Sequence, residues 1–151
     1  MANVRKKLSD LPCLCASYRR AARALSQLYD DAIRPAGLRG TQFTLLQALD
    51  ITGEITQGAL GEVLAIDSTT LTRTLRIMIR EQWIAERRGA DRRERFLSLT
   101  KAGRNRFKQA LPFWKRAQEQ IRKQLGETRW RESFKLTGEL ASLATDQGGN
   151  S

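Results

Sequence analysis

Apolar residues recur at steps of three and four near the start of the chain, a spacing that predicts an amphipathic helix over residues 12–33. Pro12 suits the first position of this helix. We expect the helix to end at Arg34, because the residue before a proline resists the helical conformation, and Gly37 suits a turn. Its predicted apolar face comprises Leu14, Tyr18, Ala21, Leu25, Leu28 and Ala32.

Shorter helices are predicted to follow. Thr41 is expected to cap the first of them and Gly53 to end it, and Thr56 is expected to start the second. Asp67 then suits the N-cap of a helix over residues 68–82. The tight turn between the last two helices is typical of a helix-turn-helix.

After residue 82 the pattern changes to short extended segments. Residues 83–87 and 95–99 predict two strands, because the second alternates polar and apolar residues with period two. The charged loop 88–94 between them predicts a hairpin. Thr100 is expected to cap a long helix to about Leu125, and a last helix is predicted over residues 127–145.

The order of elements predicts a mainly α fold of the α+β class, a winged helix-turn-helix with dimerisation helices at both ends. We expect a single domain over residues 1–151, with dimerisation helices at about 1–36 and 101–145. The winged helix-turn-helix occupies about 37–100, and the tail 146–151 is expected to be disordered. An amphipathic helix at each end has little to bury against in one subunit, so we expect a homodimer.

The charge points to a polyanionic partner. Lys and Arg number 27 against 16 Asp and Glu, a net charge of +11, which favours nucleic acid ahead of an anionic membrane surface. No apolar run approaches the roughly 20 residues that span a bilayer. No signal peptide is visible, so we expect a cytoplasmic protein without a membrane partner.

The chain contains no histidine, which excludes histidine-based catalytic and metal sites. No glycine-rich phosphate loop is visible either. We therefore expect no enzyme, no cofactor and no metal, although a lysine- or carboxylate-based enzyme remains an alternative.

The helix over residues 68–82 has an outer face of small polar and basic side chains. Serine and threonine near its start can approach base edges in the major groove, and an arginine one turn later can reach guanine O6 and N7. The predicted DNA contacts on this helix are Ser68, Thr69, Thr70, Thr72, Arg73 and Arg76.

The hairpin supplies a second basic element, because residues 87–95 hold five arginines that a minor groove would attract. Asp91 is expected to orient the guanidinium of Arg93 through a charge-assisted pair. The predicted contacts are Arg88, Asp91, Arg92 and Arg93. Either feature alone is typical of a solvated surface, whereas the two in tandem favour DNA binding.

The chain resembles the MarR family (multiple antibiotic resistance regulator) over about residues 12–145. The most specific likeness is the run 86–103, which resembles that family's wing with its Asp-x-Arg core and the following Leu-Thr-x-x-Gly. Residues 67–73 resemble the start of its recognition helix, and residues 37–38 and 41–43 resemble the entry to its second helix. One departure is Trp83, where family members often carry a smaller aliphatic residue.

The resemblance implies a dimer that binds pseudo-palindromic double-stranded DNA operators, usually as a repressor that a small molecule releases. It implies an effector site, for a phenolic or other aromatic ligand, that Tyr18, Arg19 and Tyr29 could face. A purely structural role for these residues is equally compatible with the sequence.

Cys13 and Cys15 are expected to be free thiols. The place of Cys15 is similar to that of the reactive cysteine in the peroxide-sensing branch of the family, but the tyrosine expected one turn later is Arg19 here. A thiol-based peroxide-sensing repressor is therefore one alternative, and a small apolar role for both cysteines is its competitor. A non-specific basic DNA-binding architectural protein is the other alternative.

Overall fold

The computed structural model describes residues 12–146 and shows a mostly helical chain with a small sheet. Contacts divide it into two compact units, with the division in the sequence between Trp114 and Lys115. The elements are α2 (Leu14–Ile33), η1 (Arg34–Ala36), α3 (Gly40–Thr52), β1 (Glu54–Thr56), α4 (Gln57–Leu64), α5 (Ser68–Arg80), β2 (Ile84–Arg88), β3 (Arg95–Leu99), α6 (Lys101–Leu125) and α7 (Glu127–Asp146). The winged helix-turn-helix fold is thereby confirmed, while its division into dimerisation helices and a DNA-binding part stays a prediction. The predicted tail lies almost wholly outside the described residues.

Most helix ends follow the predicted signals. Gly53 ends α3 with a positive φ of 75°, and Thr56 caps α4 by accepting a hydrogen bond from the backbone N–H of Ala59. The prediction that Thr41 caps α3 is wrong. The N-cap is Arg39, two residues earlier, and the side chain of Gln42 accepts a hydrogen bond from the backbone N–H of Arg39 at 2.9 Å.

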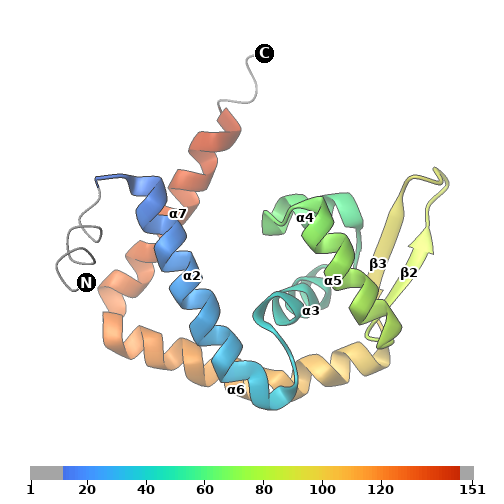
Figure 1. Cartoon of the computed structure of the whole chain (residues 1–151), viewed down its shortest axis with the longest axis horizontal. Coiled ribbons are helices and arrows are strands. Elements are labelled where there is room, and N and C mark those ends of the chain that lie inside the picture. Colours follow the sequence, from blue (N-terminus) through green and yellow to red (C-terminus); the bar gives the residue numbers. More distant parts are fainter. Residues whose placement is uncertain (1–11, 147–151) are drawn as a thin grey trace, which may run out of the picture. The chain divides into compact units, whose positions relative to one another are not determined.

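The sheet contains a strand that the sequence pattern did not reveal. β3 lies in the centre, with β1 and β2 antiparallel on either side of it. β1 has only three residues, too few to display the alternation of a strand, and it forms because Ile55 pairs with Leu97 far along the chain. Figure 1 shows the β2–β3 hairpin, drawn in yellow, beside the green helix α5.

The core of the first unit lies between α3, α5 and the sheet. Phe43 on α3 packs against Phe107 on α6 with 5.3 Å between ring centroids and against Trp114 at 5.6 Å. Such aromatic pairs add specific geometry to the burial of apolar area. The other wholly buried large side chains are Ile33, Leu45, Leu46, Leu49, Leu60, Met78 and Leu97.

The residues of the Leu-Thr-x-x-Gly motif join the wing to α6. The Thr100 hydroxyl accepts a hydrogen bond from the backbone N–H of Gly103 at 2.9 Å and donates to the Gln82 carbonyl at 2.6 Å. The backbone N–H of Thr100 donates to the carbonyl oxygen of Trp83 at 3.1 Å. Gly103 faces the same carbonyl so closely that an added Cβ would lie 2.0 Å from its oxygen. The glycine is therefore required by close approach, not by its backbone angles.

The second unit comprises the end of α6 and α7, which Gly126 separates with a φ of 80°. Glu127 accepts hydrogen bonds from Arg122 at 2.7 Å and Arg131 at 2.9 Å. Trp130 and Phe134 make an edge-to-face pair with centroids 4.9 Å apart. Within residues 12–146, no helix is long and apolar enough to cross a membrane.

We expect Gly103→Ala to lower the free energy of unfolding by about 1–3 kcal/mol, because the new methyl group must push the Trp83 carbonyl away. Urea unfolding followed by circular dichroism measures this. Gly138→Ala is the matched control, since a Cβ there meets nothing within 4 Å and alanine favours a helix by roughly 0.5–1 kcal/mol. Equal effects of the two substitutions would contradict the close approach.

Candidate nucleic-acid interface

The start of α5 is fixed by the carboxylate of Asp67. Its Oδ1 accepts a hydrogen bond from the backbone N–H of Thr70 at 2.9 Å, as the sequence predicted for an N-cap. The Thr70 hydroxyl and backbone hydrogen bonds together hold the pKa of Asp67 below its usual value. The first turn of the helix therefore has a defined direction.

The predicted contact residues of α5 divide into two groups. Ser68, Thr69, Arg73 and Arg76 are exposed, as a reading surface requires. Thr70 and Thr72 are only partly exposed, and Thr70 is used in the cap. The exposed group is thus free to donate hydrogen bonds to an external partner.

Thr72 has a partner that sequence reasoning missed. The Nε2 of Gln57, the first residue of α4, donates a hydrogen bond to the Thr72 hydroxyl at 3.1 Å. No local pattern marks Gln57, because the two residues lie fifteen positions apart.

The five arginines of the hairpin also fall into two groups. Arg87 on β2 forms an ion pair with Glu54 on β1, its Nε 3.3 Å from Oε2, and its guanidinium lies 4.4 Å from the Phe96 ring centroid. This contact spans the central strand. Arg95 lies 3.5 Å from the carboxylate of Glu86. These two arginines thus form ion pairs between strands of the sheet.

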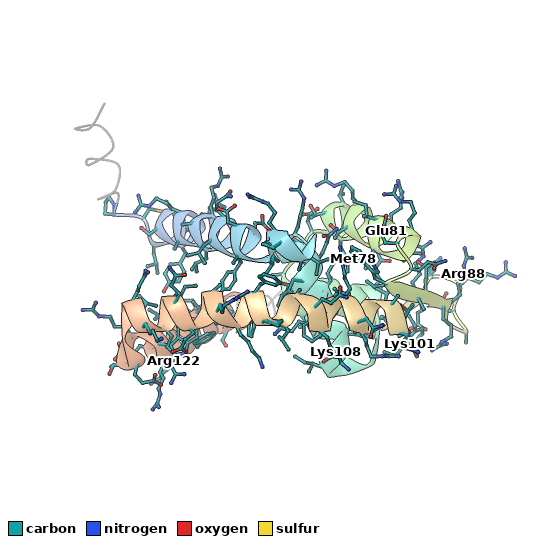
Figure 2. The ribbon with its side chains drawn as sticks, turned by 90° about the horizontal axis from the view of Figure 1, so that it is seen from below. Met78, Glu81, Arg88, Lys101, Lys108 and Arg122 are labelled. Carbon is teal, nitrogen blue, oxygen red and sulfur yellow. The ribbon has the colours of Figure 1, made fainter. Side chains whose placement is uncertain are left out.

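The three remaining arginines are the ones predicted to contact DNA. Arg88, Arg92 and Arg93 are exposed and form no ion pair within the described part of the chain. Figure 2 shows Arg88 at the hairpin, near the outer end of the first unit. The predicted orientation of the Arg93 guanidinium by Asp91 is wrong. The Asp91 carboxylate instead accepts a hydrogen bond from the backbone N–H of Arg93 at 2.9 Å, so it shapes the loop.

A groove of about 730 Å³ lies between the helix-turn-helix and the hairpin. One wall carries the start of α5, including Ser68, and the other carries residues 93–95 of the hairpin. The remaining lining residues are Thr56, Gln57, Gly58, Gly61, Glu62, Ala65, Ile66, Asp67 and Leu71. The groove thus places the beginning of the candidate reading helix and the basic loop on one surface.

The residues predicted for an effector or redox role lie on α2. Cys15 and Arg19 are exposed, as is Cys13 at the helix N-cap, and Tyr18 is half-buried. Tyr29 is half-buried, and its burial raises the pKa of the phenol. These roles stay predictions. Across residues 12–146 there is no cluster of three or more Cys, Asp or Glu side chains that could hold a metal ion.

Comparisons with known proteins agree with this geometry. Residues 38–94 match the model of the MarR family. The chain is 28% identical over 90 residues to the uncharacterized HTH-type transcriptional regulator YwoH of Bacillus subtilis (strain 168). That match spans 60% of this chain and 66%, just under two thirds, of the relative.

Solved structures match almost the whole chain. The M. tuberculosis transcriptional regulator MosR in complex with DNA is 35% identical, with a TM-score of 0.75, and the match covers 87% of this chain and 98% of that one. A variant of MarR from E. coli complexed with operator DNA is 19% identical, with a TM-score of 0.76, over 87% of this chain and 96% of that one. At that identity the second structure supports the fold alone.

The ion pair between Glu54 and Arg87 gives a pH-dependent prediction. The Arg87 side chain lowers the pKa of Glu54, so the contribution of the pair to stability is present above the ordinary glutamate pKa of about 4.3 and lost as the pH falls through the lowered value. We expect the carboxyl carbon of Glu54 to titrate below that ordinary value in an NMR experiment. In Arg87→Gln the midpoint of Glu54 should return upward, toward the ordinary value. An unchanged Glu54 midpoint would contradict the pairing.

Proposed function

Because the chain belongs to the MarR family of transcriptional regulators, we propose that it binds double-stranded DNA sequence-specifically as a homodimer. In this proposal α5 enters the major groove and the β2–β3 hairpin contacts the neighbouring minor groove. The protein is a regulator and not an enzyme, and it acts in the cytoplasm.

The observation that carries this proposal is the shared surface of α5 and the hairpin. Exposed Ser68, Thr69 and Arg73 occupy the start and first turns of α5, where side chains of a recognition helix reach base edges. The hairpin loop adjoins the same groove through residues 93–95. Its arginines that form no ion pair among the described residues carry the positive charge that a narrow minor groove attracts. The M. tuberculosis regulator MosR, which was solved in complex with DNA, supports the same assignment.

Exposed apolar side chains support dimerisation. On α2, Leu14 and Leu25 are 61% and 44% exposed, and on α7, Phe134 and Leu143 are 59% and 62% exposed. Leaving large apolar side chains of these terminal helices exposed to water is unfavourable in free energy. A second copy of the chain that covers them would also set two reading heads on a pseudo-palindromic operator.

The proposal extends to repression that a small aromatic or phenolic molecule relieves. Half-buried Tyr18 and Tyr29 on α2 offer aromatic surface and hydroxyl groups of the kind that such a ligand contacts. A related fold, the PcaV regulator from Streptomyces coelicolor, was solved in complex with its natural ligand. Thermal-shift screening of phenolic compounds, followed by release of bound DNA, tests this extension.

The deciding experiment measures binding to two duplexes by fluorescence anisotropy over a salt series. One duplex comes from upstream of the gene for this protein, and the other is a scrambled version of it. Sequence-specific regulation predicts roughly a thousandfold or greater preference for the native duplex at physiological salt. Equal affinities with the same steep salt dependence would instead favour the architectural alternative.

Arg73→Ala and Arg93→Ala are expected to affect DNA binding in different ways. Arg73→Ala should cost about 1–3 kcal/mol on the preferred duplex and relax base preference, because it removes a base contact. Arg93→Ala should weaken binding to all duplexes more evenly and lower the salt slope by about one. Competition anisotropy measures both quantities. If Arg73→Ala left affinity unchanged, α5 would be misassigned.

Phe134→Glu is expected to shift the protein from dimer to monomer, because it places a charge on an apolar face that the second copy would cover. Sedimentation equilibrium at micromolar concentration measures the mass. Ile51→Glu is the control, since Ile51 is 78% exposed on α3 and lies outside the proposed dimerisation helices. A wild-type protein that sediments as a monomer would refute the dimer.

A further inference from the structure

A side-chain hydrogen bond joins the two helices of the helix-turn-helix. The Nε2 of Gln57 on α4 donates to the Thr72 hydroxyl on α5 across 3.1 Å, and both side chains are partly buried. The Gln57 side chain forms no other hydrogen bond within residues 12–146. Its side chain also lines the groove between α5 and the hairpin. Thr72 itself is preceded in the sequence by Leu71 of the core and followed by the exposed Arg73.

We propose that Gln57 is a positioning residue that sets the base preference of the protein through Thr72; this inference rests on the proposed sequence-specific DNA binding. A threonine hydroxyl has one hydrogen to donate and two lone pairs to accept with, and it rotates to suit its partner. In this structure the Gln57 amide occupies a lone pair of that hydroxyl. The hydrogen is thereby turned away from Gln57 and left for an external acceptor.

The chemical consequence is a choice between base edges. Guanine O6 and N7, adenine N7 and thymine O4 accept hydrogen bonds in the major groove, whereas the N4 amino group of cytosine and the N6 amino group of adenine donate. With one lone pair taken by Gln57, the hydroxyl has its hydrogen and one lone pair left for the DNA, so the accepting edges gain relative to a donating amino group. Without Gln57 both lone pairs can serve that amino group, so the discrimination falls.

The alternative role of Gln57 is a contact to a phosphate. First helices of helix-turn-helix proteins cross the DNA backbone, so a free amide N–H on α4 has a phosphate within plausible reach. That role predicts a loss of affinity for every duplex. The positioning role predicts a change at one base pair in each half-site.

The test begins with a duplex selected by the wild-type protein from a library with a randomised central region. Each base pair of this duplex is then replaced in turn, and competition anisotropy gives the preference of each protein at each position. We expect Gln57→Ala and Thr72→Val to reduce the preference at the same base pair by about three- to tenfold, the loss of one hydrogen bond. The double variant should be no less selective there than Thr72→Val.

The Gln57→Glu variant gives a more specific test, because it predicts a shift of the base preference and not only its loss. A carboxylate can only accept, so the Thr72 hydroxyl would donate to it and present lone pairs to the DNA. The preference at that base pair should then shift toward a donating cytosine or adenine edge. Because the preference is a ratio within one protein, the added negative charge does not disturb it.

Thr74→Val and Gln47→Ala are matched controls. The Thr74 hydroxyl donates to the Thr70 carbonyl at 2.9 Å inside α5, and Gln47 is half-buried on α3. Both variants should keep the wild-type preferences. The inference is overturned if Gln57→Ala weakens all duplexes equally, or if it alters a different base pair from Thr72→Val. If the wild-type protein enriches no sequence, the proposed function fails together with the inference.

Discussion

The backbone of Trp83 is the point at which the candidate reading helix, the wing and the start of α6 are joined. The backbone N–H of Trp83 donates to the Met78 carbonyl at the end of α5, and its own carbonyl receives the N–H of Thr100. β2 begins at the next residue, and Gly103 of α6 lies against the same oxygen. The two backbone groups of one residue therefore connect the end of α5, the root of the hairpin and the first turn of α6. A movement of the first turns of α6 would therefore shift both α5 and the β2–β3 hairpin, the two elements of the proposed DNA-binding surface.

The side chain of Trp83 strengthens this junction. The guanidinium of Arg106 on α6 lies 5.2 Å from its ring centroid, and Arg106 Nη2 approaches the Gly37 carbonyl at 3.4 Å. The Arg106 Nε is buried without a hydrogen-bond partner among the described residues, so the aromatic face offsets part of the loss of water around the cation. Trp83, which stands where the family pattern has a smaller aliphatic residue, thus has a structural role. It supplies the face on which a partly buried arginine can rest.

The features that the sequence predicted correctly depend on residues close together in the chain. Asp67 caps α5 within three residues, and Thr100 caps α6 within three, so neither depends on the rest of the fold. The features that it missed depend on distant partners. β1 exists through its pairing with β3, and Gln57 meets Thr72 only once the turn between α4 and α5 has formed. Asp91 shows a third case, in which the partner residue was right but the partner atom was the backbone N–H.

The arginines of the hairpin show why the net charge is a poor guide to a binding surface. The two that lie on strands and pair with glutamates, Arg87 and Arg95, are held against the sheet. Exposed ion pairs of this kind contribute little to stability, so their main effect is geometric. They fix the direction of the hairpin and leave the three arginines outside such pairs, Arg88, Arg92 and Arg93, to meet an external anion. The positions of Glu54 and Glu86, more than the number of arginines, therefore decide which cations of the hairpin stay outside ion pairs and are available to the proposed DNA partner.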